Sequence, residues 1–160
     1  MEKARSLWVI YLSLLVALLC QLVPMTMEWR VFRPALTDLV LIYWILALPH
    51  RVGVATAFCV GVLLDVVEGS PPGLSSPGLM LSSLVVLFNY QRIRQFDGLQ
   101  QMATVFLLLV LSLGIEQWLR TGVDHPMLPF GALSGLLISA LLWLPVRNGL
   151  RHLRRYYEVY

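Results

Sequence analysis

The chain has 160 residues, of which 58% are hydrophobic and only 13% are charged, and its formal net charge at pH 7 is +3. Together with a mean hydropathy of +0.75, this composition excludes an ordinary soluble protein and indicates an integral membrane protein. The small excess of positive charge comes without a basic groove interleaved with aromatic residues, so we expect no nucleic-acid partner.

Six apolar stretches predict six short transmembrane helices. Most of them contain 15 to 18 residues, fewer than the roughly 20 that an upright helix needs to cross a bilayer core, so we expect tilted helices or helices buried by their neighbours. No repeat or long linker divides the chain. The predicted fold is therefore one all-α integral membrane domain over residues 1–160, a compact bundle. Its predicted spans are residues 7–23, 35–49, 52–67, 74–90, 102–119 and 131–146.

The second and third stretches are typical of two helices folded back on each other. Pro34 suits the first turn of a helix, and the run from Pro49 to Gly53 favours a tight turn. Each helix carries one carboxylate, Asp38 near the start of the first and Asp65 near the end of the second. An antiparallel hairpin would place both carboxylates within about one turn of the same end of the bundle.

Small residues recur at every fourth position of the third stretch, at Gly53, Ala57 and Gly61. This spacing places them on one face of a helix, where a second helix can approach closely. The face packs either within this chain, which is the more common case, or against the span of a partner protein.

The distribution of positive charge predicts how the chain is oriented. Nine Lys and Arg residues fall on the side of the two termini and three on the other side, which predicts that both termini are cytoplasmic. Trp8 and Trp143 are expected at the inner membrane interface and Trp29 and Trp118 at the outer one, whereas Trp44 lies deeper in a span and is expected to pack in the core.

The last fifteen residues form a basic tail. As a helix, residues 146–160 would carry apolar side chains on one side and arginines on the other, which suits the surface of an anionic leaflet. The apolar residues are Leu150, Leu153 and Tyr157, and the arginines are Arg147, Arg151 and Arg154.

The carboxylates gather toward the predicted outer end. Glu116 stands four residues before Arg120, a spacing that favours a local ion pair on a helix. Asp38 and Asp65 also allow a rival interpretation as an intramembrane aspartyl protease, in which two carboxylates share a proton. The chain resembles the lipoprotein signal peptidases in its length and in these aspartates, but it lacks their asparagine-containing motifs. No metal-ligand spacing or phosphate-binding loop is present, so we expect no cofactor.

The most specific pattern lies in the predicted hairpin, where LPHRVG runs from Leu48 to Gly53 and D-x-x-x-G from Asp65 to Gly69. In these residues, and over the whole chain in length, six-span pattern and basic tail, the chain resembles the rod shape-determining MreD family of Gram-negative bacteria. The residues expected to form a structural or partner-binding motif, from this resemblance and the small-residue face together, are Arg33, Pro34, Asp38, Trp44, His50, Arg51, Gly53, Ala57, Gly61, Asp65 and Gly69.

The resemblance implies a non-enzymatic scaffold of the inner membrane that helps to organise peptidoglycan synthesis for cell shape. Its implied partner is an MreC-like protein with a single span, and the wider assembly includes MreB, a RodA-type glycosyltransferase and an elongation-specific transpeptidase. A homo-oligomer is a further option. The resemblance also implies a fold similar to the substrate-binding subunits of energy-coupling-factor vitamin transporters, which leaves open an alternative function as a small-molecule or lipid-binding membrane subunit.

Overall fold

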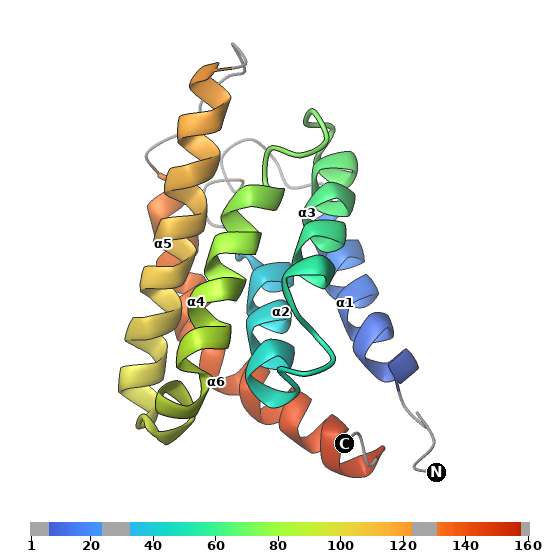
Figure 1. Ribbon diagram of the computed structural model, residues 1–160, viewed down its shortest axis with the longest axis vertical. Coiled ribbons are helices and arrows are strands. Elements are labelled where there is room, and N and C mark those ends of the chain that lie inside the picture. The colour runs from blue at the N-terminus through green and yellow to red at the C-terminus, as the bar shows by residue number, and fades with distance from the viewer. Residues whose placement is uncertain (1–6, 24–32, 123–130, 158–160) are drawn as a thin grey trace.

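The computed structural model describes residues 7–23, 33–122 and 131–157. In these residues the chain has helices and no strands, and each of the six apolar stretches coincides with one helix (Figure 1). The prediction of an all-α fold is therefore confirmed for the part of the chain that the structure describes. The helices are α1 (Leu7–Gln21), α2 (Leu36–Ala47), α3 (Val54–Glu68), α4 (Ser76–Gln95), α5 (Gly98–Gly122) and α6 (Ala132–Tyr156).

The six helices form two layers of three. In the front layer of Figure 1, α4 lies between α3 and α5, and in the layer behind it α2 lies between α1 and α6. The two central helices, α2 and α4, pack against each other across the layers. Every residue from Leu39 to Leu48 is buried, as expected for a helix that is apolar on all sides. The shortest helix, α2, is thus the centre of the bundle.

The predicted pairing of α2 with α3 is wrong, although the turn between them is present. The backbone N–H groups of Arg51 and Val52 both donate to the carbonyl oxygen of Leu48, at 3.0 Å. The chain then crosses to the other layer, where α3 packs against α4 and α1 rather than against α2. Because α2 is apolar on every side, its sequence does not specify which helix covers which face.

The small-residue face of α3 packs against α4. A Cβ atom on Gly61 would lie 2.6 Å from the Cα of Ser76, and Ala57 on the same face is fully buried. Gly53 takes no part in this contact, because it precedes the helix and a Cβ atom there would meet nothing within 4 Å. The face therefore consists of two positions rather than three, and both pack within this chain.

The last helix extends well beyond its predicted span and covers one end of the bundle. It runs without a break through Pro145 to Tyr156, and its final part turns to run across the end of the bundle at which α1 begins (Figure 1). A proline inside a helix lacks the N–H group for one hydrogen bond and commonly bends the helix. The ring of Tyr157 contacts that of Trp8 edge to face, with 5.4 Å between centroids. We call this end the lower end and the opposite one the upper end, as in Figure 1.

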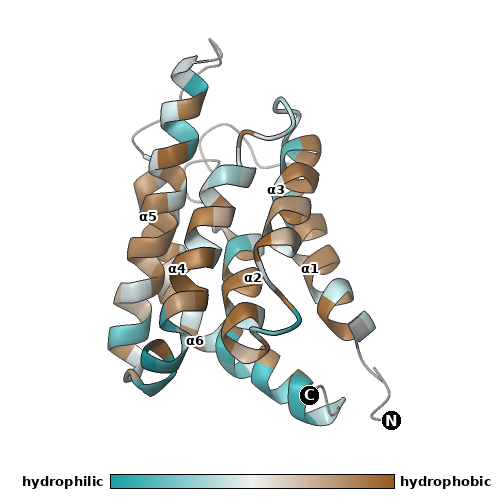
Figure 2. Cartoon of the chain, in the orientation of Figure 1, coloured by the Kyte–Doolittle hydropathy of each residue, from teal (hydrophilic) through white to brown (hydrophobic). Residues whose placement is uncertain are grey.

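The outer surface of the bundle is apolar. Figure 2 shows hydrophobic residues along the middle of the helices and hydrophilic residues at both ends. Two helices, Gly98–Gly122 and Leu133–Tyr156, are long and apolar enough to cross a membrane, and α1 and α2 are shorter apolar helices. A soluble monomer rarely exposes so much contiguous apolar surface, whereas a lipid-facing surface requires it. The exposed apolar residues include Leu12, Leu15 and Leu19 on α1, Leu107 and Leu111 on α5, and Leu137 and Leu141 on α6.

Candidate functional site

A cavity of about 150 Å³ opens among the helix ends at the upper end of the bundle. We call it the acidic cavity, because Asp38, Glu68 and Glu116 line it and the one positively charged side chain among its described lining residues is Arg33. These residues come from α2, α3, α5 and the segment before α2. The cavity therefore depends on the relative positions of several helices and on no single motif. Its other lining residues are Gln21, Ala35, Leu64, Ser75, Leu79, Leu109, Ser112, Leu113 and Leu136.

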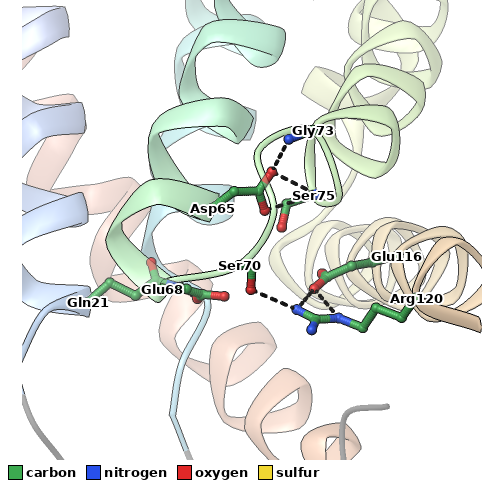
Figure 3. A network of polar contacts seen from close by, with 8 residues as sticks. All are labelled: Gln21, Asp65, Glu68, Ser70, Gly73, Ser75, Glu116 and Arg120. Atoms are coloured by element: carbon green, nitrogen blue, oxygen red, sulfur yellow. Dashed lines mark hydrogen bonds and ion pairs between the residues drawn. The ribbon is translucent and has the colours of Figure 1, made fainter. Parts of the chain in front are cut away.

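Asp65 lies at the same end of the bundle but is held by the backbone. Its side chain is fully buried, and one carboxylate oxygen, Oδ2, accepts hydrogen bonds from the backbone N–H groups of Gly73 at 2.7 Å and Ser75 at 3.2 Å (Figure 3). The other oxygen, Oδ1, accepts from the Ser75 N–H at 3.1 Å. Because Ser75 is the residue before α4, the carboxylate anchors the start of α4 to the end of α3. Asp38 lines the acidic cavity, but Asp65 does not.

The predicted ion pair between Glu116 and Arg120 is present. The guanidinium Nη2 and Nε atoms of Arg120 lie 2.5 and 3.0 Å from one carboxylate oxygen of Glu116. Arg120 is buried, with 3% of its surface exposed, and it also reaches the hydroxyl of Ser70 at 3.5 Å (Figure 3). This pair therefore connects α5 to the loop between α3 and α4, directly beside the acidic cavity.

A short chain of polar side chains at the upper end was not predicted from the sequence. Thr37 donates from its hydroxyl to the side-chain oxygen of Gln21 at 2.6 Å, and the Gln21 amide donates to a carboxylate oxygen of Glu68 at 3.4 Å. It joins the ends of α1 and α3 to the start of α2. The sequence feature that could have predicted it is the presence of Gln21 and Thr37 within apolar stretches, because buried polar groups need hydrogen-bond partners.

The remaining motif residues separate into three places. Trp44 is fully buried in the core, where its indole N–H donates to the hydroxyl of Ser13 at 2.8 Å. His50 and Arg51 are exposed in the turn after α2. Gly69 ends α3 with a φ of 70°, a left-handed conformation that favours glycine.

The start of α2 differs slightly from the expectation. Arg33 and Pro34 lie in the non-helical segment before α2, which begins at Leu36. The backbone N–H of Ala35 donates to the hydroxyl of Ser139 at 2.8 Å, so this segment is tied to α6. The first helical residue of α2, Leu36, thus follows Pro34 by two positions.

A second cavity, of about 260 Å³, lies at the lower end. We call it the arginine cavity, because four of its ten lining residues are arginines. Trp143, which was expected at the membrane interface, lines this cavity instead and is fully buried. Its indole N–H donates to the side-chain oxygen of Gln101 on α5 at 3.3 Å, so the ring points into the bundle rather than toward the membrane interface. The lining residues are Tyr43, Leu46, Ala47, Arg94, Phe96, Gln101, Trp143, Arg147, Arg151 and Arg154.

These features define a helical membrane protein with an apolar outer surface and polar helix ends. Among the described residues, no group of three His, Cys, Asp or Glu side chains is arranged to hold a metal ion. The arrangement offers charged cavities and hydrogen-bonded helix ends.

The comparisons with known proteins agree on one family. The family model described as rod shape-determining protein MreD matches residues 3–153. The chain is also 31% identical over 153 residues to the rod shape-determining protein MreD of Haemophilus influenzae, a match that covers 92% of each chain. The chain therefore belongs to the MreD family of rod shape-determining proteins, bacterial membrane proteins. No solved structure matches it.

Proposed function

We propose that this chain is a non-enzymatic scaffold subunit of the cell-elongation complex in the bacterial inner membrane. In this role it binds an MreC-like single-span protein and helps to organise peptidoglycan synthesis, with MreB, a RodA-type glycosyltransferase and a transpeptidase in the wider assembly. The observation that carries the proposal is membership of the rod shape-determining family over nearly the whole chain.

We further propose that residues 1–160 form one membrane domain with six spans and cytoplasmic termini. The lower end then faces the cytoplasm, in agreement with the nine positively charged residues on the side of the termini. The 12 residues of α2 give a length of about 18 Å, which is short for a bilayer core of roughly 30 Å. Burial of α2 among α1, α4 and α6 removes this difficulty, because its ends need not reach lipid headgroups.

The contacts of Asp65 support a non-enzymatic role over an aspartyl protease. In a catalytic dyad, two carboxylates share a proton around a water molecule. Both carboxylate oxygens of Asp65 accept hydrogen bonds from backbone N–H groups, so the carboxylate is fixed in place and neither oxygen is left to share a proton with a second carboxylate. Asp65 is therefore assigned a structural role.

Six of the motif residues form two groups, one buried in the bundle and one lining a cavity. Ala57, Gly61, Trp44 and Asp65 are buried and act by maintaining the bundle. Arg33 and Asp38 line the acidic cavity at the upper end, so we assign them to contacts with a partner. At about 150 Å³, the cavity is smaller than the roughly 300–1,000 Å³ of sites for drug-sized ligands. Its size favours the scaffold over a vitamin-binding transporter subunit.

A complementation experiment tests this proposal. In a rod-shaped bacterium that has lost its own protein of this family and grows as spheres, expression of this chain is expected to restore rods. An Asp38→Asn variant, whose carboxamide retains the size of the side chain, is expected to accumulate normally, to lose co-purification with the MreC-like protein and to restore shape poorly. Lost function with normal co-purification would instead indicate a chemical role for this carboxylate. Normal accumulation of the wild-type chain without any restoration of shape would contradict the proposal.

A further inference from the structure

The arginine cavity gathers four positively charged side chains at one place. Arg94 comes from the end of α4, and Arg147, Arg151 and Arg154 come from the part of α6 that crosses the lower end. None of the described residues that line the cavity is acidic. Guanidinium groups around one cavity repel one another, so an anion that lies beside Arg94, Arg147 and Arg151 would stabilise the arrangement.

Two of these arginines are held in place by neutral groups. Arg94 donates from Nη2 to the carbonyl oxygen of Ala47, the last residue of α2, at 2.7 Å. Arg147 donates from Nη1 to the side-chain oxygen of Gln101 at 2.6 Å. Since both acceptors are uncharged, these bonds orient the guanidinium groups and leave their positive charge uncompensated.

Gln101 is itself fixed by its neighbours. Its amide nitrogen donates to the carbonyl oxygen of Ile93 at 2.9 Å, and its oxygen also accepts from the indole N–H of Trp143 at 3.3 Å. Both Gln101 and Trp143 are buried. The position of the Arg147 guanidinium is thus determined by a rigid part of the core, which is the preorganisation that a binding site needs.

The Nε–H of Arg147 is a second and independent sign of a missing ligand. This atom is buried and has no hydrogen-bond partner in the part of the chain that the structure describes. Buried donors are normally paired, so this one indicates room for a bound hydrogen-bond acceptor. In addition, Tyr43 lies within electrostatic reach of Arg147, Arg151 and Arg154, and its hydroxyl adds a polar group beside the three guanidinium groups.

We infer that the arginine cavity binds a phosphate group. Planar guanidinium groups match the oxygens of phosphate with paired hydrogen bonds, and basic pockets between helices on the cytoplasmic side are suited to anionic lipid headgroups. The walls formed by Leu46, Phe96 and Trp143 are apolar, and Leu99, three residues after Phe96 in the chain, is 78% exposed. This mixture favours the phosphodiester of an anionic phospholipid, whose headgroup carries no cation to repel the arginines, over free phosphate. Its location in the inner leaflet rests on the proposed orientation.

Arginines on the cytoplasmic side also orient a membrane protein, but this role does not require them to line one cavity. Arg92 and Arg155 do not line the cavity, as expected of arginines that only set the orientation of the chain. They provide matched controls, because Arg155 adjoins Arg154 on α6 and Arg92 is two residues from Arg94 on α4. Binding at a defined site requires the cavity arginines and not these two.

Thermal unfolding of the full chain in dodecyl maltoside micelles tests the inference. Phosphatidylglycerol added to the micelles is expected to raise Tm, and the same amount of zwitterionic phosphatidylcholine is not. Inorganic phosphate is tested as a third addition. A rise in Tm with phosphatidylglycerol alone identifies the lipid headgroup as the ligand, whereas an equal rise in Tm with inorganic phosphate identifies free phosphate. No rise with either, or an equal rise with phosphatidylcholine, would overturn the inference.

Variants then locate the site. Arg151→Gln changes an exposed residue and is expected to leave the fold intact while weakening phosphatidylglycerol binding by roughly tenfold, the loss expected for one charge-assisted hydrogen bond. Arg147→Gln is expected to have at least this effect, and its unliganded Tm reports any damage from the lost bond to Gln101. Arg155→Gln is expected to bind as the wild type does. An equal loss in Arg155→Gln and Arg151→Gln would mean non-specific attraction and would overturn the site.

Discussion

Gly61 and Ser76 lie so close together that α3 and α4 meet there backbone to backbone. A Cβ atom on Gly61 would lie 2.6 Å from the Ser76 Cα and 2.8 Å from its hydroxyl oxygen. Neither helix can move without disturbing the loop that Asp65 anchors. The contact therefore fixes the geometry of the front layer and, with it, one wall of the acidic cavity.

Gly61→Ala is expected to destabilise the isolated subunit. The added methyl group meets backbone atoms, which cannot move aside as a flexible side chain can, and overpacking of this kind typically costs about 1–3 kcal/mol. Gly114→Ala is the matched control, because Gly114 is also inside a helix but a Cβ atom there would meet nothing within 4 Å. Thermal unfolding in detergent measures both variants. Equal stability of Gly61→Ala and the wild type would contradict the close contact.

Asp65→Ala is expected to lower the amount of folded protein. The substitution leaves the N–H groups of Gly73 and Ser75 without their acceptor, and each unpaired buried donor costs about 1–3 kcal/mol. The loss of rod-shape function should then follow the loss of protein in membrane fractions, measured by immunoblotting. A variant that accumulates normally but is inactive would instead indicate a direct chemical role for this carboxylate.

Arg120→Gln is expected to be strongly destabilising, and a second substitution should relieve part of the effect. Removing the guanidinium group leaves the partly buried Glu116 without its partner, and breaking a buried ion pair in this way costs about 3 kcal/mol. In the double variant Glu116→Gln/Arg120→Gln, the uncompensated charge is gone. A double-mutant cycle on the free energy of unfolding measures this coupling, and strictly additive losses would contradict it.

The orientation can be tested by reporter fusions. A fusion after Tyr160 is expected to be active with a cytoplasmic reporter and inactive with a periplasmic one, because the arginine-rich lower end is retained on the cytoplasmic side. A fusion in the turn between α4 and α5, beside Asp97, is expected to give the same result. Activity of a periplasmic reporter at either position would place the arginine cavity on the periplasmic side and would contradict the proposed orientation.

The positions of the helices could be predicted from the sequence, but their neighbours could not. Apolar stretches separated by residues such as Pro49 and Gly69 mark where helices begin and end. The faces of α2 carry no such information, because it is apolar all round. The predicted pairing of α2 with α3 failed for this reason. Asp38 and Asp65 nevertheless lie at the same end, because helices that alternate in direction bring those positions together.

The two cavities differ in how far the sequence could predict them. Asp38 and Glu116 of the acidic cavity stand near helix ends, so counting residues along each helix was sufficient to place them at the same end of the bundle. It did not show that Glu68 lines the cavity and Asp65 does not. The arginine cavity depends on how α6 continues past Pro145, which carries Arg147, Arg151 and Arg154 beneath α2. The sequence predicted an amphipathic helix there, but the direction of a helix after a proline is set by tertiary packing and not by its own residues.

The most direct test of the account is to identify the proteins that purify with this chain. After extraction of native membranes in a mild detergent and affinity purification of the tagged, full-length chain, mass spectrometry identifies its partners. The account predicts an MreC-like single-span protein together with enzymes of peptidoglycan synthesis. Recovery of a pair of ATPases and a bound vitamin, without an MreC-like protein, would contradict it.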